Sequence, residues 1–284
     1  MSYIFFSLTL TALAGAQEQV YFQAHRGGLE EMPENTIEAF NHAWAIKGAV
    51  PEADLRTTAD GVIICIHDAT PARTLSAPPE FEDTPIARLP WDRIRTWDAA
   101  GKFAAEFAGA RVPTLRRVFE AMQAEPGRML YLDPKDVRWQ QLESLIEEYR
   151  VADQVLFAIG SQQECLDLKK RMPHAGTMTW LSGLPLRIEK QYRELAAAGF
   201  KGIDQLQLHL HARNQTPSVQ YILDDAFLKE AVAQTKAAGV ELQLRPFKFD
   251  HRSLRRLLEI GVTWFVTDAP AAFRDALNKA LALP

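Results

Sequence analysis

The stretch VYFQAHRGGLEEMPENTIEAF, residues 20–40, contains the unit from which the chain is built. An apolar run at 20–24 has the character of a buried strand, and a helical pattern at 35–47 follows after a short loop. Between the two lie His25, Arg26 and a pair of glycines. A strand followed by a helix is the repeating unit of parallel α/β folds, so this stretch predicts that class.

The same unit repeats along the rest of the sequence. Helix starts carry plausible caps, and Asn35-Thr36-Ile37-Glu38 has the character of a capping box. Eight strands that alternate with helices over roughly 250 residues predict a (β/α)8 TIM barrel. The strands are expected at 20–24, 52–56, 129–133, 154–158, 177–181, 203–208, 241–244 and 264–267, and the helices at 35–47, 114–123, 138–149, 163–171, 187–198, 225–238, 251–259 and 270–281.

One apolar run does not fit the alternation. GVIICIH, residues 61–67, follows the second strand too closely for a parallel crossover, which needs about a dozen residues or more. Asp60-Gly61 is a hairpin turn signal, so the run is expected to return antiparallel to the second strand. We therefore predict a distorted barrel in which this hairpin delivers His67 to the mouth. Residues 69–112 are predicted to form a small inserted cap after strand 2.

Composition and charge narrow the function classes. The 284 residues are 47% hydrophobic and 24% charged, which is typical of a globular protein with a large core. The net charge of -4 argues against the basic stripe of a nucleic-acid binder, so we expect no nucleic-acid partner. Cys65 and Cys165 lie in a predicted strand and a predicted helix. We expect two buried free thiols, although export would permit them to pair.

The first residues, MSYIFFSLTLTALAGA, are typical of a signal peptide at 1–16. An apolar and hydroxylic run precedes Ala14-Gly15-Ala16, which fits cleavage before Gln17. A retained anchor and an N-terminal structural segment are the alternatives. The run is short for a bilayer span, which needs about 20 residues, so we expect no stable membrane insertion. The predicted mature chain, 17–284, would be periplasmic or secreted.

Polar residues follow the predicted strands at the points where the strands end. In a (β/α)8 barrel the C-terminal strand ends supply the active site. Side chains at i and i+2 on one strand face the same side, so a strand can present two of them together. The candidates are His25 and Arg26 after the first strand, Glu52 and Asp54 on the second, Asp133 and Lys135 at the third, and His67 at the end of the hairpin.

These residue types point to metal-assisted phosphoryl transfer. Three carboxylates, Glu52, Asp54 and Asp133, make a hard oxygen site that suits Ca²⁺ or Mg²⁺. Two histidines are suited to acid–base work near neutral pH. The cations Arg26 and Lys135 are suited to bind a phosphate.

Each of these residues also has a structural interpretation. Taken alone, His25 is more typical of a structural histidine whose ring nitrogens are hydrogen-bonded within the fold. Glu52 and Asp54 could be surface residues on an outward strand face, and Asp133-Pro134-Lys135 a plain turn. His209 and His211 share a strand face, and a solvated strand end is favoured there over a metal site.

Together the residues resemble the glycerophosphodiester phosphodiesterase family, over nearly all of the predicted mature chain. The resemblance implies a TIM barrel with a divalent cation, Ca²⁺ or Mg²⁺, held by Glu52, Asp54 and Asp133. It implies an acid–base pair, a phosphate-binding pair, and attack of the glycerol 2-hydroxyl on phosphorus to give a cyclic phosphate that water opens. The matching motifs are His25-Arg26-Gly27, Pro33-Glu34-Asn35-Thr36, Glu52-x-Asp54, Thr58-x-Asp60-Gly61, His67-Asp68, Arg73, Pro113-Thr114-Leu115, Asp133-x-Lys135 and Thr267-Asp268-x-Pro270.

Two departures from the family pattern concern the cation and the substrate. The third carboxylate is commonly Glu in the family and is Asp133 here. The family often has Trp-Thr-Val-Asn late in the barrel, where this chain reads LQLRPFKFD, residues 242–250. Phe247 is the expected replacement for the substrate-packing aromatic, and Arg245 and Lys248 add positive charge.

The first hypothesis is hydrolysis of glycerophosphodiesters to an alcohol and glycerol 3-phosphate, with His25 and His67 as acid and base and a small-molecule phosphodiester as the partner. The second keeps the fold but changes the substrate to lysophospholipids or another head-group diester. The third is a non-catalytic barrel that binds a phosphorylated ligand. The alcohol, the cation and the oligomeric state stay open at this level.

Overall fold

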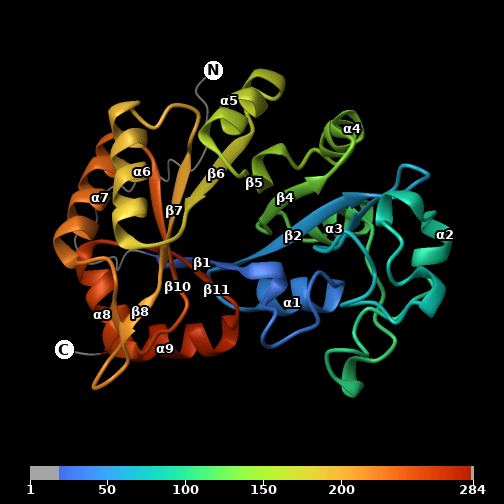
Figure 1. The fold of residues 1–284 in the computed structure, drawn as a ribbon, viewed down its shortest axis with the longest axis horizontal. Coiled ribbons are helices and arrows are strands. Elements are labelled where there is room, and N and C mark those ends of the chain that lie inside the picture. The colour runs from blue at the N-terminus through green and yellow to red at the C-terminus, as the bar shows by residue number, and fades with distance from the viewer. Residues whose placement is uncertain (1–18, 283–284) are drawn as a thin grey trace.

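A closed barrel of eight parallel strands forms the centre of the computed structural model, which describes residues 19–282 (Figure 1). The strands lie in the order β1-β11-β10-β7-β6-β5-β4-β2, and β1 also pairs with β2 to close the barrel. The predicted barrel is confirmed. Its strands are β1 (Tyr21–Ala24), β2 (Ala49–Thr57), β4 (Leu130–Asp136), β5 (Val155–Ala158), β6 (Gly176–Leu181), β7 (Gln205–Leu210), β10 (Glu241–Pro246) and β11 (Trp264–Thr267).

Each expected helix is present within a few residues of its predicted bounds. The helices surround the barrel, and their apolar faces pack with the outward strand residues into two large clusters of buried side chains. They are α1 (Ile37–Ala45), α3 (Leu115–Gln123), α4 (Trp139–Tyr149), α5 (Gln162–Arg171), α6 (Pro185–Ala197), α7 (Asp225–Ala237), α8 (His251–Ile260) and α9 (Pro270–Ala282).

The predicted capping box at the start of α1 is wrong. The N-cap is Thr36, whose hydroxyl accepts a hydrogen bond from the Ala39 amide, and no reciprocal bond from Glu38 accompanies it. Asn35 instead has a left-handed backbone with φ 58°. This conformation, which asparagine tolerates better than most residues, turns its side chain away from the helix and toward β2.

The predicted hairpin is confirmed. β3 (Ile63–Cys65) runs antiparallel to the outer half of β2, where Leu55 pairs with Cys65. In the tight turn the Thr58 hydroxyl donates to Asp60, and Gly61 has φ 89°. β2 is longer than predicted chiefly at its start, because Ala49, Val50 and Pro51 pair with β1 to close the barrel.

Residues 69–112 form short helical turns with their own apolar cluster, packed on β3. The described turns are η2 (Pro79–Phe81), η3 (Ile86–Arg88), α2 (Trp91–Ile94) and η4 (Ala105–Phe107). The Asp60 side chain accepts from the backbone amide of Trp91, so the hairpin turn also anchors the start of α2. A second small hairpin, β8 (Ala212–Asn214) with β9 (Gln220–Tyr221), follows β7 and was not predicted.

The barrel interior is partly polar, which the sequence patterns did not indicate. Gln207 donates to Gln243 at 2.8 Å, and Gln243 donates to the Tyr131 hydroxyl at 3.2 Å. The Tyr131 hydroxyl in turn donates to Gln205 at 2.8 Å. Buried amides of this kind are stable only when their hydrogen bonds are satisfied, and this network satisfies them from three strands.

Cys65 and Cys165 are buried and unpaired, as predicted. Between residues 19 and 282, every helix is too short or too polar to cross a bilayer. The predicted signal peptide, 1–16, lies outside the described residues.

Candidate active site

Three buried carboxylates from two neighbouring strands lie together at the C-terminal end of the barrel. Ligand oxygens of Glu52, Asp54 and Asp133 are all within 4.8 Å of one another. Asp54 and Asp133 are paired in register on β2 and β4, and Glu52 faces the same side as Asp54 because it is two residues earlier. An all-oxygen set of this charge fits a hard divalent cation such as Ca²⁺ or Mg²⁺.

The electrostatics of this acidic cluster favour a bound cation. Burial, together with the charges of Glu52 and Asp54, raises the pKa of Asp133 to about 7. The Lys135 ammonium contacts Asp133 and lies 3.3 Å from Asp54. Burial alone would lower the pKa of Lys135, but the charges of Asp54 and Asp133 raise it above its usual range. Three carboxylates thus face two cations, Lys135 and Arg26, whose Nε lies 3.6 Å from Asp54.

Asp54 is held in place by the loop before α1. Asn35 donates to Asp54 Oδ2 at 2.8 Å, and the Asp54 amide donates back to Asn35 Oδ1 at 2.9 Å. Arg26 Nε lies 3.6 Å from the same carboxylate. The loop that carries His25 and Arg26 therefore contacts the carboxylate cluster directly, and it places a guanidinium beside a candidate metal ligand.

His25 lies between the acidic cluster and a second carboxylate. Its Nδ1 is 2.6 Å from Asp268 Oδ1, and its Nε2 is 3.9 Å from Glu52 Oε2. Burial would raise the pKa of Asp268, but the hydrogen bond and charge of His25, with the charges of Arg245 and Arg26, lower it overall. An ionised Asp268 holds the Nδ1 proton, and Nε2 is then the ring atom directed at the acidic cluster.

Arg245 is a third member of this arrangement. Its Nη2 lies 3.1 Å from Asp268 Oδ1 and 2.9 Å from His25 Nδ1. Since the His25 Nδ1–H donates to the ionised Asp268, the Arg245 guanidinium also donates to that carboxylate and packs against the edge of the imidazole. Arg245 lies on β10, and Asp268 directly follows β11.

His67 has a matching partner on the hairpin side of the mouth. Its Nδ1 is 2.7 Å from Asp68 Oδ1, and Arg73 binds Asp68 and Glu34 with bidentate pairs. The hydrogen bond from Arg73, aided by His67 and opposed by burial, lowers the pKa of Asp68 to about 2. Glu34 also accepts from Arg26 at 3.1 Å, so a continuous chain of charged contacts joins the two histidine-bearing segments.

The glycines after His25 are required by close packing. Gly27 has φ 85°, and a Cβ there would lie 2.7 Å from the Ala39 Cβ. Gly28 has φ 107°, and its Cβ would lie 2.7 Å from the Pro270 ring. This contact explains why the motif around Asp268 includes Pro270, since the proline brings the start of α9 against the loop of His25.

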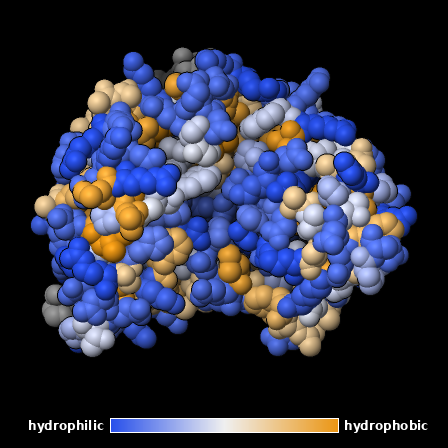
Figure 2. All heavy atoms as spheres, in the orientation of Figure 1, coloured by the Kyte–Doolittle hydropathy of each residue, from blue (hydrophilic) through white to orange (hydrophobic). Residues whose placement is uncertain are grey.

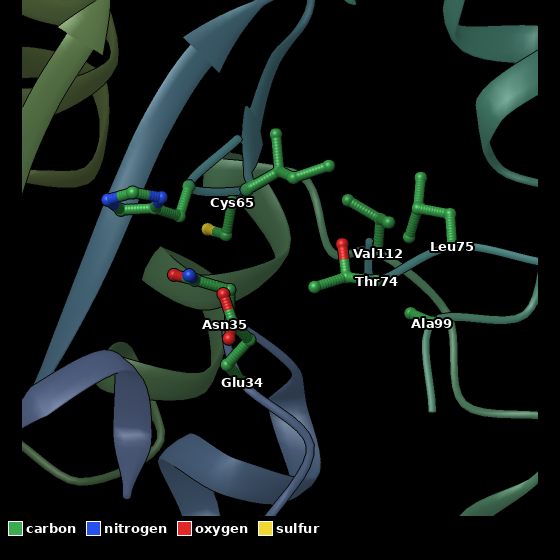
Figure 3. Close-up of a pocket in the computed structure, with 9 residues that line it drawn as sticks. Glu34, Asn35, Cys65, Thr74, Leu75, Ala99 and Val112 are labelled. Atoms are coloured by element: carbon green, nitrogen blue, oxygen red, sulfur yellow. The ribbon is translucent and has the colours of Figure 1, made fainter. Parts of the chain in front are cut away.

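A small pocket separates the loop of Glu34 and Asn35 from the insertion, and His67 and Cys65 contribute to its lining. Figure 3 shows Glu34 and Asn35 on one side of it, and Thr74, Leu75, Ala99 and Val112 on the other. The insertion therefore forms one wall beside His67.

His209, His211 and Phe247 form an aromatic group on the opposite rim. The ring of His211 stacks on Phe247 at 4.5 Å, and His209 meets the same ring edge-on at 5.2 Å. Arg245 lies over Phe247 at 4.9 Å. This rim includes Phe247, from the stretch where the chain departs from the family pattern, and both Phe247, 36% exposed, and His211 reach the surface.

The fold brings the seven sequence-predicted residues to one end of the barrel. The residues that sequence reasoning did not assign are the partners: Asn35 for Asp54, Asp268 and Arg245 for His25, and Asp68 for His67. Asp68 and Asp268 stood in the quoted motifs, so the motifs carried a signal for their importance without indicating their roles.

Comparison with known proteins agrees with this geometry. Residues 25–272 match the sequence model of the Glycerophosphoryl diester phosphodiesterase family. A Glycerophosphodiester phosphodiesterase of Caldanaerobacter subterraneus is 28% identical, with 90% of this chain and 97% of the relative covered. A mouse protein named Lysophospholipase D GDPD1 is 30% identical, with 90% and 85% covered.

Solved structures share the fold. A glycerophosphodiester phosphodiesterase from Agrobacterium tumefaciens superposes with a TM-score of 0.72 at 21% identity, over 90% of this chain and 100% of that one. A phosphodiesterase from Oleispira antarctica, solved with the product sn-glycerol-3-phosphate, gives a TM-score of 0.64 at 22% identity, over 91% and 96%.

Proposed function

Because the chain belongs to the glycerophosphoryl diester phosphodiesterase family, we propose that it hydrolyses glycerophosphodiesters to an alcohol and glycerol 3-phosphate. The observation that carries the proposal is the cluster of Glu52, Asp54 and Asp133 with the His25 imidazole at its edge. In this proposal the three carboxylates hold a divalent cation, Ca²⁺ or Mg²⁺. When bound, the cation supplies positive charge against the negative charge that develops on the phosphate oxygens.

The two histidines exchange protons with the substrate in this mechanism. Each Nδ1 lies beside a carboxylate, so each Nε2 is the atom that gives or takes a proton. One imidazole accepts the proton of the glycerol 2-hydroxyl as that oxygen attacks phosphorus, and the other protonates the departing alcohol. Water then opens the cyclic phosphate with the proton transfers reversed, and glycerol 3-phosphate is released.

Arg26 and Lys135 bind the phosphate in this proposal. Both cations lie at the edge of the carboxylate cluster, Arg26 Nε at 3.6 Å and Lys135 Nζ at 3.3 Å from Asp54 oxygens. A phosphodiester that approaches the cluster therefore meets two positive groups, which offset the repulsion between its own charge and the acidic ligands.

The test is a substrate panel of glycerophosphocholine, glycerophosphoethanolamine and glycerophosphoinositol with Ca²⁺, Mg²⁺ or EDTA. We expect release of glycerol 3-phosphate that EDTA abolishes and a cation restores. His25→Ala is expected to lower kcat at least about 100-fold, as loss of a general acid or base does. His174→Ala, in the exposed turn before β6, is the matched control and should keep full activity. Full activity in His25→Ala would refute the assigned role.

Lysophospholipids belong in the same panel. Two named relatives are lysophospholipase D proteins whose matches cover 90% of this chain, and this supports lysophospholipid hydrolysis as the second candidate. Turnover of lysophospholipids alone would replace the first proposal with this one. Binding of a diester without turnover under every cation would instead favour a non-catalytic barrel.

Export of the mature chain to the periplasm or beyond is proposed from the sequence of residues 1–16. Expression in a bacterium with a secretory pathway, followed by mass measurement of the purified protein, tests it. A mass that corresponds to a chain beginning at Gln17 is expected, and a retained Met1 would contradict cleavage.

A further inference from the structure

The most exposed large apolar side chains between residues 19 and 282 are two leucines at the start of α6. Leu184 is 77% exposed and Leu186 is 82% exposed, on either side of Pro185. The loop that holds them follows the C-terminal end of β6, so it belongs to the rim where the active site opens. Single exposed apolar residues are ordinary, but an adjacent pair on the rim of a site indicates an interaction surface.

The leucines are presented by a firmly anchored helix. Ile188 and Tyr192, on the other side of α6, are fully buried in the core, and Tyr192 packs against Phe200 and Phe227. With that face of the helix buried, the leucines are left directed outward. Figure 2 shows a hydrophobic group where α6 begins, on the same face as a central hollow lined by hydrophilic residues.

A large aromatic residue on β6, the strand before this loop, faces the barrel interior. Trp180 is half-buried on β6 and paired in register with Gln207, whose side chain crosses the interior to Gln243. Trp180 therefore faces the inside of the mouth, where it packs against the interior cluster that contains Met178. The β6 side of the mouth thus presents an indole beside the interior amides, whereas the side on β2 and β4 presents the acidic cluster.

Positive charge accompanies the leucines. Arg187 and Lys190 are exposed on the first turns of α6, directly after Leu186. Glu189 pairs with Arg193 and Glu194 with Lys190, so Arg187 is the cation of these first turns that is not taken up by an ion pair within the helix. A phospholipid surface has the complementary arrangement, because an apolar layer lies beneath a layer of phosphates.

We propose that Leu184, Leu186 and Arg187 form a docking surface for phospholipid aggregates, with the leucines in the acyl-chain boundary and Arg187 among the head-group phosphates. Docking there would bring the mouth of the barrel to a lipid surface. The proposal goes beyond the proposed hydrolysis, and because docking is measured without turnover, either can fail separately.

The experiment is sedimentation of the purified chain, in EDTA, with vesicles of phosphatidylcholine alone or mixed with phosphatidylglycerol. Burial of one leucine side chain corresponds to a factor of about ten in partitioning. Leu184→Ser with Leu186→Ser is therefore expected to weaken vesicle binding at least about tenfold. Arg187→Glu should weaken binding to the mixed vesicles more than to pure phosphatidylcholine.

Phe103→Ser is the matched control, because Phe103 is 42% exposed but belongs to the insertion and not to α6. It should bind vesicles as the wild type does, and each variant should keep wild-type activity on a soluble glycerophosphodiester. Absence of wild-type binding to both vesicle types would overturn the proposal. So would an equal loss in Phe103→Ser, or a wild-type dimer that the double leucine variant dissociates, since the face would then join two copies of the chain.

Discussion

Asp268 is the residue on which the geometry of His25 depends most directly. Its carboxylate contacts both the imidazole and the Arg245 guanidinium, at 2.6 and 3.1 Å. The carboxylate fixes which ring nitrogen carries the proton, and Arg245 keeps the carboxylate ionised and oriented. Arg245 lies in LQLRPFKFD, residues 242–250, and its contacts tie this stretch of β10 to the catalytic histidine proposed here.

Asp268→Asn is expected to lower kcat at least about 100-fold with a smaller change in KM, because an amide no longer favours the Nδ1–H form of His25. Steady-state kinetics on the best glycerophosphodiester measures both constants. Asp275→Asn, on the exposed face of α9, is the control and should match the wild type. An Asp268→Asn enzyme with wild-type kcat would show that His25 needs no carboxylate partner.

His209 makes the stability of the fold depend on pH. Burial, together with the charges of Arg245, His211 and His25, lowers its pKa from 6.5 to about 4. The unfolded chain takes up this proton near pH 6.5 and the folded chain only near pH 4. Stability from this group is therefore complete above pH 6.5 and is lost as the pH falls from 6.5 toward 4.

His209→Gln should reduce this acid sensitivity. Glutamine retains an amide that can donate to Gln207 as the imidazole does, but it takes up no proton. Urea unfolding at pH 7 and pH 4.5 is expected to show a wild-type loss of free energy of unfolding that is about 1–3 kcal/mol larger than in the variant. His174→Gln, in the exposed turn before β6, is the control. Equal losses in wild type and His209→Gln would contradict the assignment.

At the scale of elements, the loop after β1 and the start of α9 depend on each other. Gly28 has positive φ and leaves space for Pro270, while the Glu30 amide donates to the Asp268 carbonyl at 3.0 Å. These contacts hold His25 and Asp268 together, so the two motifs act as one packing unit.

Gly28→Ala and Gly199→Ala separate backbone strain from this packing. Both glycines have positive φ, but a Cβ at Gly199 meets nothing within 4 Å. Gly199→Ala is expected to cost about 1 kcal/mol through φ alone, and Gly28→Ala about 2–4 kcal/mol because the Pro270 ring must also move. Urea denaturation gives both values. If both variants lose the same free energy of unfolding, the Pro270 ring moves without cost and the close contact contributes nothing to stability.

At the scale of the whole molecule, cation binding is expected to stabilise the fold. The repulsion within Glu52, Asp54 and Asp133 is relieved by a bound ion, and an ion at 100 times its Kd stabilises by about 2.7 kcal/mol. For a chain of this size that corresponds to a rise in Tm of roughly 5–10 °C. Thermal unfolding with EDTA, Ca²⁺ or Mg²⁺ measures it. Asp133→Asn should lose most of the shift, and an unchanged Tm in the wild type with both ions would argue against a metal site.

The sequence by itself determined the barrel and the hairpin, and it predicted the seven candidate residues that the fold gathers at one end of the barrel. Periodic apolar runs indicate strands and helices locally, and strand ends must share one face of a parallel barrel, so His25, Glu52, Asp54 and Asp133 were predicted together. The Asp60-Gly61 turn is equally local, and it fixes the antiparallel return that brings His67 to the mouth.

Only the tertiary structure decided which side chains contact the site residues. His25 and Asp268 are 243 residues apart and meet because β1 pairs with β11 when the barrel closes. Arg245, Gln207 and Gln243 acquire their contacts in the same way, from strands that no local pattern relates. The exposed leucines of α6 belong here as well, since exposure depends on which neighbours the fold supplies. Local periodicity encodes which elements form, whereas side-chain partnership depends on the register of strands that are distant in sequence.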